Sequence, residues 1–300
     1  MSLDLTGASP YVEDKNKTYI KALIGGASTI NRLITAGNVQ TGVKTKAPVL
    51  VFKRNVIIQT GGACGRNPMG STKLSDSELK VFKMKINEDY CFEELENMYF
   101  THILLKDGAD PENNVNDSFV NDLIEETIKS TNANDEITFW IGDSTSTTLP
   151  VNQRKFDGVL KQLAAPTAMS GADLVEKLQK VAMDADVNIR NQEDFYIYVG
   201  QNVADAYKLA LANKNIYQPT EDLKVFGTSI KLMPTPGLNG TDIVVAGRDS
   251  NFQVGTDLRS DKENVKWKYS METEKYYLDA YWSLGVAIVF PDETKAYNVA

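Results

Sequence analysis

The sequence predicts an α+β fold, and three features of the chain support this prediction. Two β-prone segments flank a glycine-rich stretch between Pro48 and Ile86, which is typical of a long hairpin. From Asp117 to about Asn132, apolar residues recur at helical spacing. From Tyr276 to Phe290, every even position is apolar, as in a strand with one buried face. The length suits one large or two ordinary globular domains.

Composition and charge indicate a globular protein and argue against nucleic-acid-binding and membrane-spanning classes. The 300 residues are 42% hydrophobic, which is enough for a real core. The net charge of −8 and the isoelectric point near 4.9 argue against sequence-independent binding to nucleic-acid backbones. No stretch approaches the roughly 20 apolar residues of a membrane span, and the N-terminus lacks the features of a signal peptide. We therefore expect the protein to stay in the cytoplasm where it is made.

Residues 1–37 predict an extended or partly helical N-terminal arm. They are polar with small apolar patches, such as Tyr19-Ile20 and Leu33-Ile34. The pair Gly25-Gly26 is expected to interrupt any helix in this segment, because glycine is a poor helix former.

Residues 38–86 predict an extended hairpin. Its ascending part contains residues 49–52 and 56–58, and its descending part, residues 81–86, alternates apolar with basic side chains. The tip, residues 60–78, is rich in Gly, Ser, Asn and Lys and can build no core. Because an isolated two-stranded ribbon is marginally stable in water, we expect a neighbouring subunit to order this arm. The residues expected to contact that neighbour lie at the tip: Gly61, Gly62, Cys64, Arg66, Met69 and Lys73.

The stretch after Asn116 predicts one long amphipathic helix. Asn116 or Asp117 is a suitable N-cap, and Glu125 and Lys129 form an i,i+4 pair in the favoured order. Residues 135–143, which end in Gly-Asp, follow this helix. One face of the helix is expected to be apolar, and it contains Phe119, Val120, Leu123, Ile124 and Ile128.

Residues 156–241 predict a compact α/β insert. Ser170 and Asp173 resemble a capping box ahead of a helix. Residues 195–199 form a continuous apolar run, as in a strand that is covered on both faces, and helical spacing resumes over residues 203–211.

The remainder of the chain, residues 242–300, predicts strands. Residues 242–246 begin this region, and apolar residues alternate with Lys and Ser from Val265 to Met271. The alternation from Tyr276 to Phe290 is the clearest strand pattern in the chain.

Motifs that could carry chemistry are weak in this sequence. Residues 65–72 have the glycine spacing of a phosphate-binding loop, but Ser71 stands where that loop needs its lysine, so a hairpin tip is the better interpretation. His102 is the only histidine and lies in an apolar neighbourhood, which favours a core or interface position. Cys64 and Cys91 lack the spacing of a metal site or an evident disulfide framework.

Two sets of side chains have both a functional and a structural interpretation. Carboxylates for acid–base work could come from Glu93, Glu94, Glu96, Glu125 and Glu126, but solvated helix faces explain them more simply. A platform for single-stranded nucleic acid could come from Trp267, Tyr269, Tyr276, Tyr277, Tyr281 and Trp282, but without a basic channel a core role is favoured. The sequence thus predicts no catalytic, cofactor-binding or metal-binding residues, and no cofactor.

The order of these features resembles that of the major capsid proteins of tailed bacteriophages, which have the Hong Kong 97 type of shell fold that encapsulins share. The resemblance covers nearly all of residues 38–292 and includes the Gly142-Asp143 exit from the helix and the stretch Gly247 to Phe252. It implies four parts, which are an N-terminal arm (1–37), an extended hairpin loop (38–86), a peripheral domain with a long spine helix (87–155 and 242–300) and an axial domain (156–241).

The resemblance also implies a function. The expected protein is a structural protein rather than an enzyme, and it assembles into the hexamers and pentamers of an icosahedral phage head that encloses double-stranded DNA. Its expected partners are further copies of itself and a portal protein. Because the sequence lacks the scaffolding extension fused to some relatives, either a separate scaffolding protein or none is expected as well. DNA would be packaged without sequence-specific binding, and no membrane partner is expected.

The expected location is the virion, after assembly in the cytoplasm of a host bacterium. Two alternatives stay open. One is the shell of an encapsulin-like compartment with a cargo enzyme, since a fold does not fix contents. The other is a soluble α/β enzyme.

Overall fold

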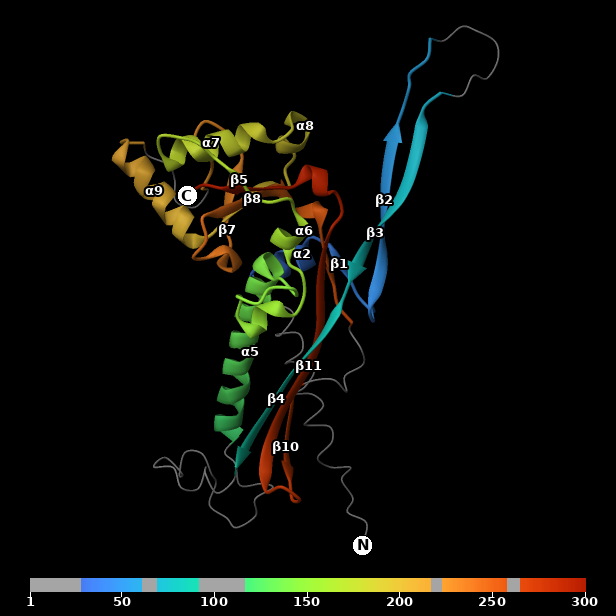
Figure 1. Ribbon diagram of the computed structural model, residues 1–300, viewed down its shortest axis with the longest axis vertical. Helices are drawn as coiled ribbons and strands as arrows, with labels where there is room; N and C mark the ends of the chain where they lie inside the picture. Colours follow the sequence, from blue (N-terminus) through green and yellow to red (C-terminus); the bar gives the residue numbers. More distant parts are fainter. Residues whose placement is uncertain (1–27, 61–68, 92–116, 217–222, 258–264) are drawn as a thin grey trace.

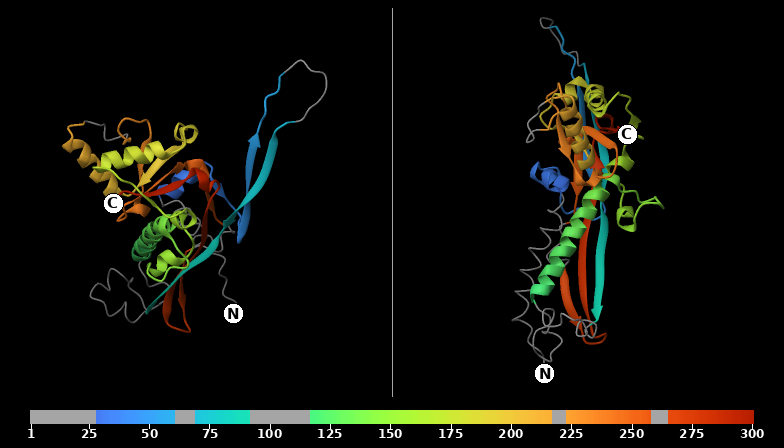
Figure 2. Two further views of the ribbon diagram at one scale, coloured as in Figure 1. Left: turned by 45° about the horizontal axis from the view of Figure 1, so that its top comes forward. Right: turned by 90° about the vertical axis from the view of Figure 1, so that its left-hand side faces the viewer.

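The computed structural model describes residues 28–60, 69–91, 117–216, 223–257 and 265–300. The molecule is elongated, with a helix-covered sheet at one end, a long sheet beside a long helix below it, and a two-stranded arm that projects away from both (Figure 1). Two further views show the far end of the arm projecting beyond the helix-covered sheet (Figure 2).

The arm consists of β2 (Lys46–Asn55) and β3 (Ser71–Lys80), which pair antiparallel from Lys46 opposite Lys80 to Asn55 opposite Ser71. The hairpin is thus confirmed, but the prediction of its second strand is wrong. Of residues 81–86, predicted to descend along the hairpin, residues 82–86 lie instead in β4, a strand of a different sheet. The sequence of β3 is polar because both faces of the arm are largely exposed, so apolar alternation could not reveal it.

The long sheet contains β1 (Val39–Gln40), β9 (Phe252–Gly255), β11 (Lys275–Ile288) and β10 (Lys266–Ser270), and β4 (Phe82–Cys91) pairs with β11 as well. The two alternating patterns near the C-terminus are therefore confirmed as β10 and β11. β11 contributes to three apolar clusters: Leu278 and Ala280 of its first half belong to one, Leu284, Val286 and Ile288 of its second half to another, and Ala287 to a small third one.

Helix α5 (Asp117–Ile141) runs beside this sheet and is longer than predicted. The sequence placed its end near Asn132, but the helix continues because Phe139 and Trp140 in its last turns are fully buried. It ends at Gly142, whose N–H donates to the carbonyl of Thr138 at 2.9 Å. A Cβ at this glycine would lie 2.4 Å from that same carbonyl oxygen, so the close approach of the chain requires glycine.

The second sheet has the order β5 (Thr167–Ala168), β12 (Lys295–Asn298), β8 (Ile243–Arg248), β6 (Phe195–Val199) and β7 (Lys231–Pro234). Helices α7 (Leu174–Asp184) and α9 (Gln201–Asn213) pack on it in one apolar core. The predicted helix–strand–helix pattern is confirmed here. β8 and β12 come from beyond residue 241, so this sheet uses more of the chain than residues 156–241.

The cap of α7 differs from the sequence prediction in one detail. Asp173 is the N-cap residue, and its carboxylate accepts from the N–H of Glu176 at 2.9 Å. The side chain of Glu176 in turn accepts from the N–H of Ala172 at 2.8 Å. Asp173 therefore pairs with Glu176 rather than with Ser170, because Asp173 occupies the N-cap position of the motif and not the position three residues after it.

The remaining short elements connect these parts. They are α2 (Ser28–Thr35), α6 (Val159–Gln162), α8 (Val187–Arg190), η1 (Val151–Arg154), η2 (Pro236–Leu238), η3 (Asp249–Asn251) and η5 (Pro291–Glu293). Within the part of the chain that the structure describes, α2 is the helical portion of the predicted N-terminal arm.

Candidate assembly surface

One face of the arm is apolar and exposed. Side chains alternate along β2, and the register with β3 places Phe52 directly opposite Leu74. Leu50, Phe52 and Leu74 are 69%, 59% and 64% exposed. We call the face that carries Leu50, Phe52, Leu74 and Asp76 the outer face. It has the composition of a protein contact, because contiguous exposed apolar residues mark interaction sites.

The opposite face of the arm, the inner face, fixes the arm to the rest of the molecule at its base. Val49, Val51 and Leu79 are buried, and Val49 and Leu79 form a small core with Ala287 of β11. A Cβ at Gly255 would lie 3.0 Å from the Leu79 side chain, so β9 also packs closely on this base. The arm is therefore held by its base while its outer face stays uncovered.

Apolar residues also continue toward the tip of the arm. Beyond the paired strands, Val56, Ile57, Ile58 and Met69 are exposed. Among the described residues, seven of the sixteen exposed large hydrophobic side chains belong to this arm. Such a concentration on one protrusion is costly in water unless another surface covers it.

The structure describes only part of the predicted contact set at the tip. Met69 and Lys73 are described, and both are exposed. The other four members, Gly61, Gly62, Cys64 and Arg66, lie outside the described residues. Sequence reasoning missed Leu50, Phe52 and Leu74 as contact residues because it assigned the apolar segments to pairing within the hairpin. Their alternation with Val49 and Val51 could have indicated two apolar faces.

Helix α2, which precedes the arm in sequence, is held by a buried network. The carboxylate of Glu136 on α5 accepts from the N–H of Thr29 at 3.0 Å and from the hydroxyl of the same residue, so it caps the start of α2. The indole N–H of Trp140 donates to the Thr29 hydroxyl at 3.3 Å. This network fixes where the chain enters β1 and the arm.

A second network holds the same helix against the other sheet. Arg32 of α2 pairs with Asp249 at 2.9 Å, and the hydroxyl of Tyr198 donates to the same carboxylate at 2.5 Å. Burial raises the pKa of Asp249, and burial together with the neighbouring Asp249 charge raises the pKa of Tyr198. The guanidinium of Arg32 also lies 5.2 Å from the centroid of the Tyr198 ring.

The predicted apolar face of α5 packs as expected where the structure describes it. Ile124 and Ile128 are buried against Leu278 and Ala280 of β11, and Leu123 is half-buried beside them. The Phe119 side chain lies outside the described residues. Glu125 pairs with Lys129 at 2.8 Å on the exposed side, which confirms the predicted i,i+4 pair.

A groove of ≈ 610 Å³ lies between α5 and β4, and Asp135 and Trp282 line it. Asp135 is only 4% exposed. Burial raises the pKa of its carboxyl to about 8, and the neighbouring Trp282 side chain offsets this only in part. This carboxyl was not among the residues singled out from the sequence, which carries no sign that the C-terminal part of α5 is buried and polar.

The aromatic set near the C-terminus contributes to packing. Tyr276 is 1% exposed, and its ring stacks on that of Trp267 with centroids 5.3 Å apart. Cys91 at the end of β4 is a free cysteine. His102, Glu93, Glu94 and Glu96 lie outside the described residues. None of the helices that the structure describes is long and apolar enough to cross a membrane.

Comparison with known proteins gives matches in structure but not in sequence. No family model matches the sequence, and no curated protein matches it. The chain is similar to a chain of the satellite phage P4 procapsid, which includes the size determination (Sid) protein. That match has a TM-score of 0.60 and 10% identity, and it covers 94% of this chain and 90% of that one.

Two further solved structures are similar over most of their length. A chain of the capsid of the Myoviridae phage XM1 matches with a TM-score of 0.53 and 13% identity, over 89% of this chain and 91% of that one. A chain of the holo-SrpI encapsulin complex from Synechococcus elongatus PCC 7942 matches with a TM-score of 0.51 and 10% identity, over 87% and 84%. These similarities confirm the predicted fold: the chain has the α+β fold of the Hong Kong 97 type.

Proposed function

We propose that this chain is the major capsid protein of a tailed bacteriophage and that it assembles into the hexamers and pentamers of an icosahedral head around double-stranded DNA. One observation carries the proposal: the arm has an uncovered apolar outer face, with Leu50, Phe52 and Leu74 about two-thirds exposed. The solved structures that share the fold include a procapsid and a capsid, which supports the same role.

Covering the outer face of the arm supplies free energy for association between copies. Fully burying a Leu or Phe side chain contributes about 1.5–3 kcal/mol, so covering the exposed parts of three such side chains contributes roughly 3–6 kcal/mol. This corresponds to about two to four powers of ten in an association constant. In the proposed shell, the arm lies on a neighbouring copy, and interfaces of this obligate kind bury about 2,000 Å² or more.

The proposal assigns a role to each part of the chain. Residues 38–86 would form the overlapping loop, except that residues 82–86 belong to β4 and so to the long sheet. The long sheet and α5 would form the peripheral domain. The α/β part, residues 156–241, would converge with other copies at the axis of each hexamer or pentamer, together with the strands that pair with β6.

The partners and location follow from this role. Each chain has a net charge of −8, so a shell built from it does not bind the phosphate backbone of DNA tightly. DNA is therefore packaged without sequence-specific binding. A portal protein and a separate scaffolding protein complete the assembly, which takes place in the cytoplasm of the host bacterium and ends in the virion. The protein acts as a structural component and not as an enzyme.

One observation favours a second candidate function. The fold is also that of a chain in an encapsulin complex, so a protein compartment with a cargo enzyme uses the same architecture. The contents of the particles distinguish the two functions, because a phage head contains DNA and a compartment contains cargo protein.

Electron microscopy and light scattering of the purified chain over a concentration series test the proposal. The expected result is closed shells, or rings of five and six copies, that appear above a threshold concentration. Nucleic-acid staining and protein analysis of particles from an infected host then identify their contents. A monodisperse monomer at all concentrations, with the arm ordered, would contradict the proposed function.

A further inference from the structure

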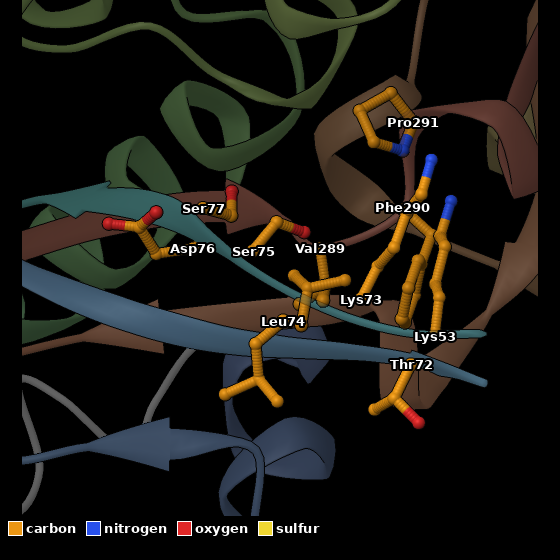
Figure 3. A pocket seen from close by; sticks show the side chains of 11 residues that line it. Lys53, Thr72, Lys73, Leu74, Ser75, Asp76, Ser77, Val289, Phe290 and Pro291 are labelled. Atoms are coloured by element: carbon orange, nitrogen blue, oxygen red, sulfur yellow. The ribbon is translucent and has the colours of Figure 1, made fainter. Parts of the chain in front are cut away.

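The inner face of the arm carries two lysines that lie directly opposite each other. Lys53 of β2 is the register partner of Lys73 of β3. In Figure 3 both ammonium groups extend to the same side as Phe290, whereas Leu74 extends to the other side. The Nζ of Lys53 lies 5.4 Å from the centroid of the Phe290 ring. Like charges directly opposite in a ladder repel each other, so this pair destabilises the arm unless an anion lies close to it.

A groove of ≈ 640 Å³ runs past these lysines, between β3 and residues 289–291. No ion pair joins Lys53 or Lys73 to an acidic residue within the ranges that the structure describes, whereas Lys46 and Lys80 of the same arm both pair with Glu78. Asp76 also lines the groove, but its carboxylate lies at the far end from the two ammonium groups (Figure 3). The groove therefore combines two unpaired cations with an aromatic ring.

The charge of the arm is opposite to that of the rest of the chain. Five basic and two acidic residues give β2 and β3 a net charge of +3, so the remainder of the chain carries −11 at pH 7. A second copy of this chain is thus the anionic surface that is always present at high concentration during assembly. Complementary charges of this kind orient partners and suppress wrong registers.

One turn of the chain matches the groove in charge and in apolar character. The turn between β10 and β11 exposes Met271 by 71% and carries Glu272 and Glu274, both of them exposed. Among the described residues, this is the one place where two exposed acidic residues without an ion pair lie two positions apart. Glu274 has a φ of 54°, which marks a tight turn. Two carboxylates beside an apolar side chain complement two ammonium groups beside an aromatic ring.

Within one copy the turn and the groove cannot meet. The turn lies at the end of β10 and β11 that is farthest from the arm, at the bottom of Figure 1, whereas the groove lies between the arm and the start of η5. We propose that Lys53 and Lys73 bind the carboxylates of Glu272 and Glu274 from a second copy, with the Met271 side chain against Phe290. This inference rests on the proposed function, and it names a specific contact within the shell.

Charge reversal on each side tests the contact. K53E/K73E and E272K/E274K are each expected to raise the threshold concentration for assembly by about tenfold or more, because each change places like charges across the contact. The quadruple variant restores opposite charges and is expected to return to within about threefold of wild type. All four residues are exposed, so circular dichroism and the Tm of the unassembled variants should match wild type.

The control variant is K83E/K85E, which makes the same change of charge on exposed residues of β4. The inference predicts that E272K/E274K does not rescue it. The inference is overturned if K53E/K73E assembles at the wild-type threshold, or if the quadruple variant is as defective as its parents. A wild-type chain that stays monomeric would contradict both this inference and the proposed function, whereas wild-type shells with an unaffected K53E/K73E variant would contradict the inference alone.

Discussion

Asp135 is expected to make the subunit less stable as the pH rises. Its folded-state pKa is about 8, against an ordinary value of 3.8, because burial disfavours the ionised carboxylate. A group whose pKa is raised on folding contributes full stability below its unfolded pKa, and that stability is lost as the pH rises through the folded pKa. The loss therefore falls between about pH 4 and pH 8.

The size of the effect follows from the shift. Four pKa units correspond to about 6 kcal/mol when both states are ionised, and the part lost between pH 5 and pH 8 is about 4 kcal/mol. Asp135→Asn keeps the shape of the side chain but removes its ionisation. The free energy of unfolding of this variant, relative to wild type, should therefore increase by about 4 kcal/mol from pH 5 to pH 8.

Urea unfolding of the unassembled subunit measures this difference. The three tryptophans report unfolding by fluorescence, and wild type and Asp135→Asn are compared at pH 5, 6.5 and 8 at a concentration below the assembly threshold. All other titrating groups are shared, so their contributions cancel in the comparison. Parallel pH profiles for the two proteins would refute the reasoning, because they would mean that the buried carboxyl does not gain a proton on folding.

Three further predictions concern the elements that position the arm. Gly142→Ala should destabilise the subunit by about 1–3 kcal/mol, because the new Cβ meets the Thr138 carbonyl oxygen at 2.4 Å; thermal unfolding measures this, and an unchanged Tm would contradict it. Phe139→Ala should cost about 3–5 kcal/mol through the cavity that it leaves, and a loss below 1 kcal/mol in urea unfolding would show that the site is not packed as described. Arg32→Met should leave Asp249 without its cation and destabilise the subunit by roughly 2–4 kcal/mol, with earlier proteolysis next to α2; equal protease resistance of both proteins would count against this anchor.

Some elements of the fold could be predicted from the sequence because the spacing of their apolar residues corresponds directly to which of their faces are buried. The first half of β11 alternates because Leu278 and Ala280 pack against α5 while Tyr277 and Tyr281 stay at least partly exposed. β6 is continuously apolar because it contributes side chains to two apolar cores, one on each face. α9 shows helical spacing because one face packs on the second sheet. In each case local spacing and tertiary burial agree.

The sequence-based predictions were wrong where the local spacing of apolar residues does not match the burial of the side chains in the fold. β3 is a real strand with a polar sequence, since it pairs through its backbone on an arm that is exposed on both sides for most of its length. The end of α5 was missed because the C-terminal part of the helix is both polar and buried, at Asp135 and Glu136, and this hides the helical period. The carboxylates there are tolerated because Glu136 caps α2 and Asp135 can take up a proton.

The candidate surface was only partly accessible to sequence reasoning. The arm and its need for a neighbour could be inferred from poor self-contact, but the residues that make the contact depend on which face of β2 is covered at its base. The covered face is determined by packing on Ala287 of β11, which lies more than two hundred positions away in the sequence. The register that brings Phe52 opposite Leu74, and Lys53 opposite Lys73, likewise needs the structure.

The central claim is that the outer face of the arm binds another copy of the chain, and assembly of Phe52→Ser/Leu74→Ser tests it most directly. Both side chains are exposed, so the subunit should keep the Tm of wild type. In a concentration series followed by light scattering and electron microscopy, wild type should form closed shells, and the variant should need at least about a hundredfold higher concentration, from the loss of roughly 3 kcal/mol. Shells of the variant at the wild-type threshold would contradict the claim.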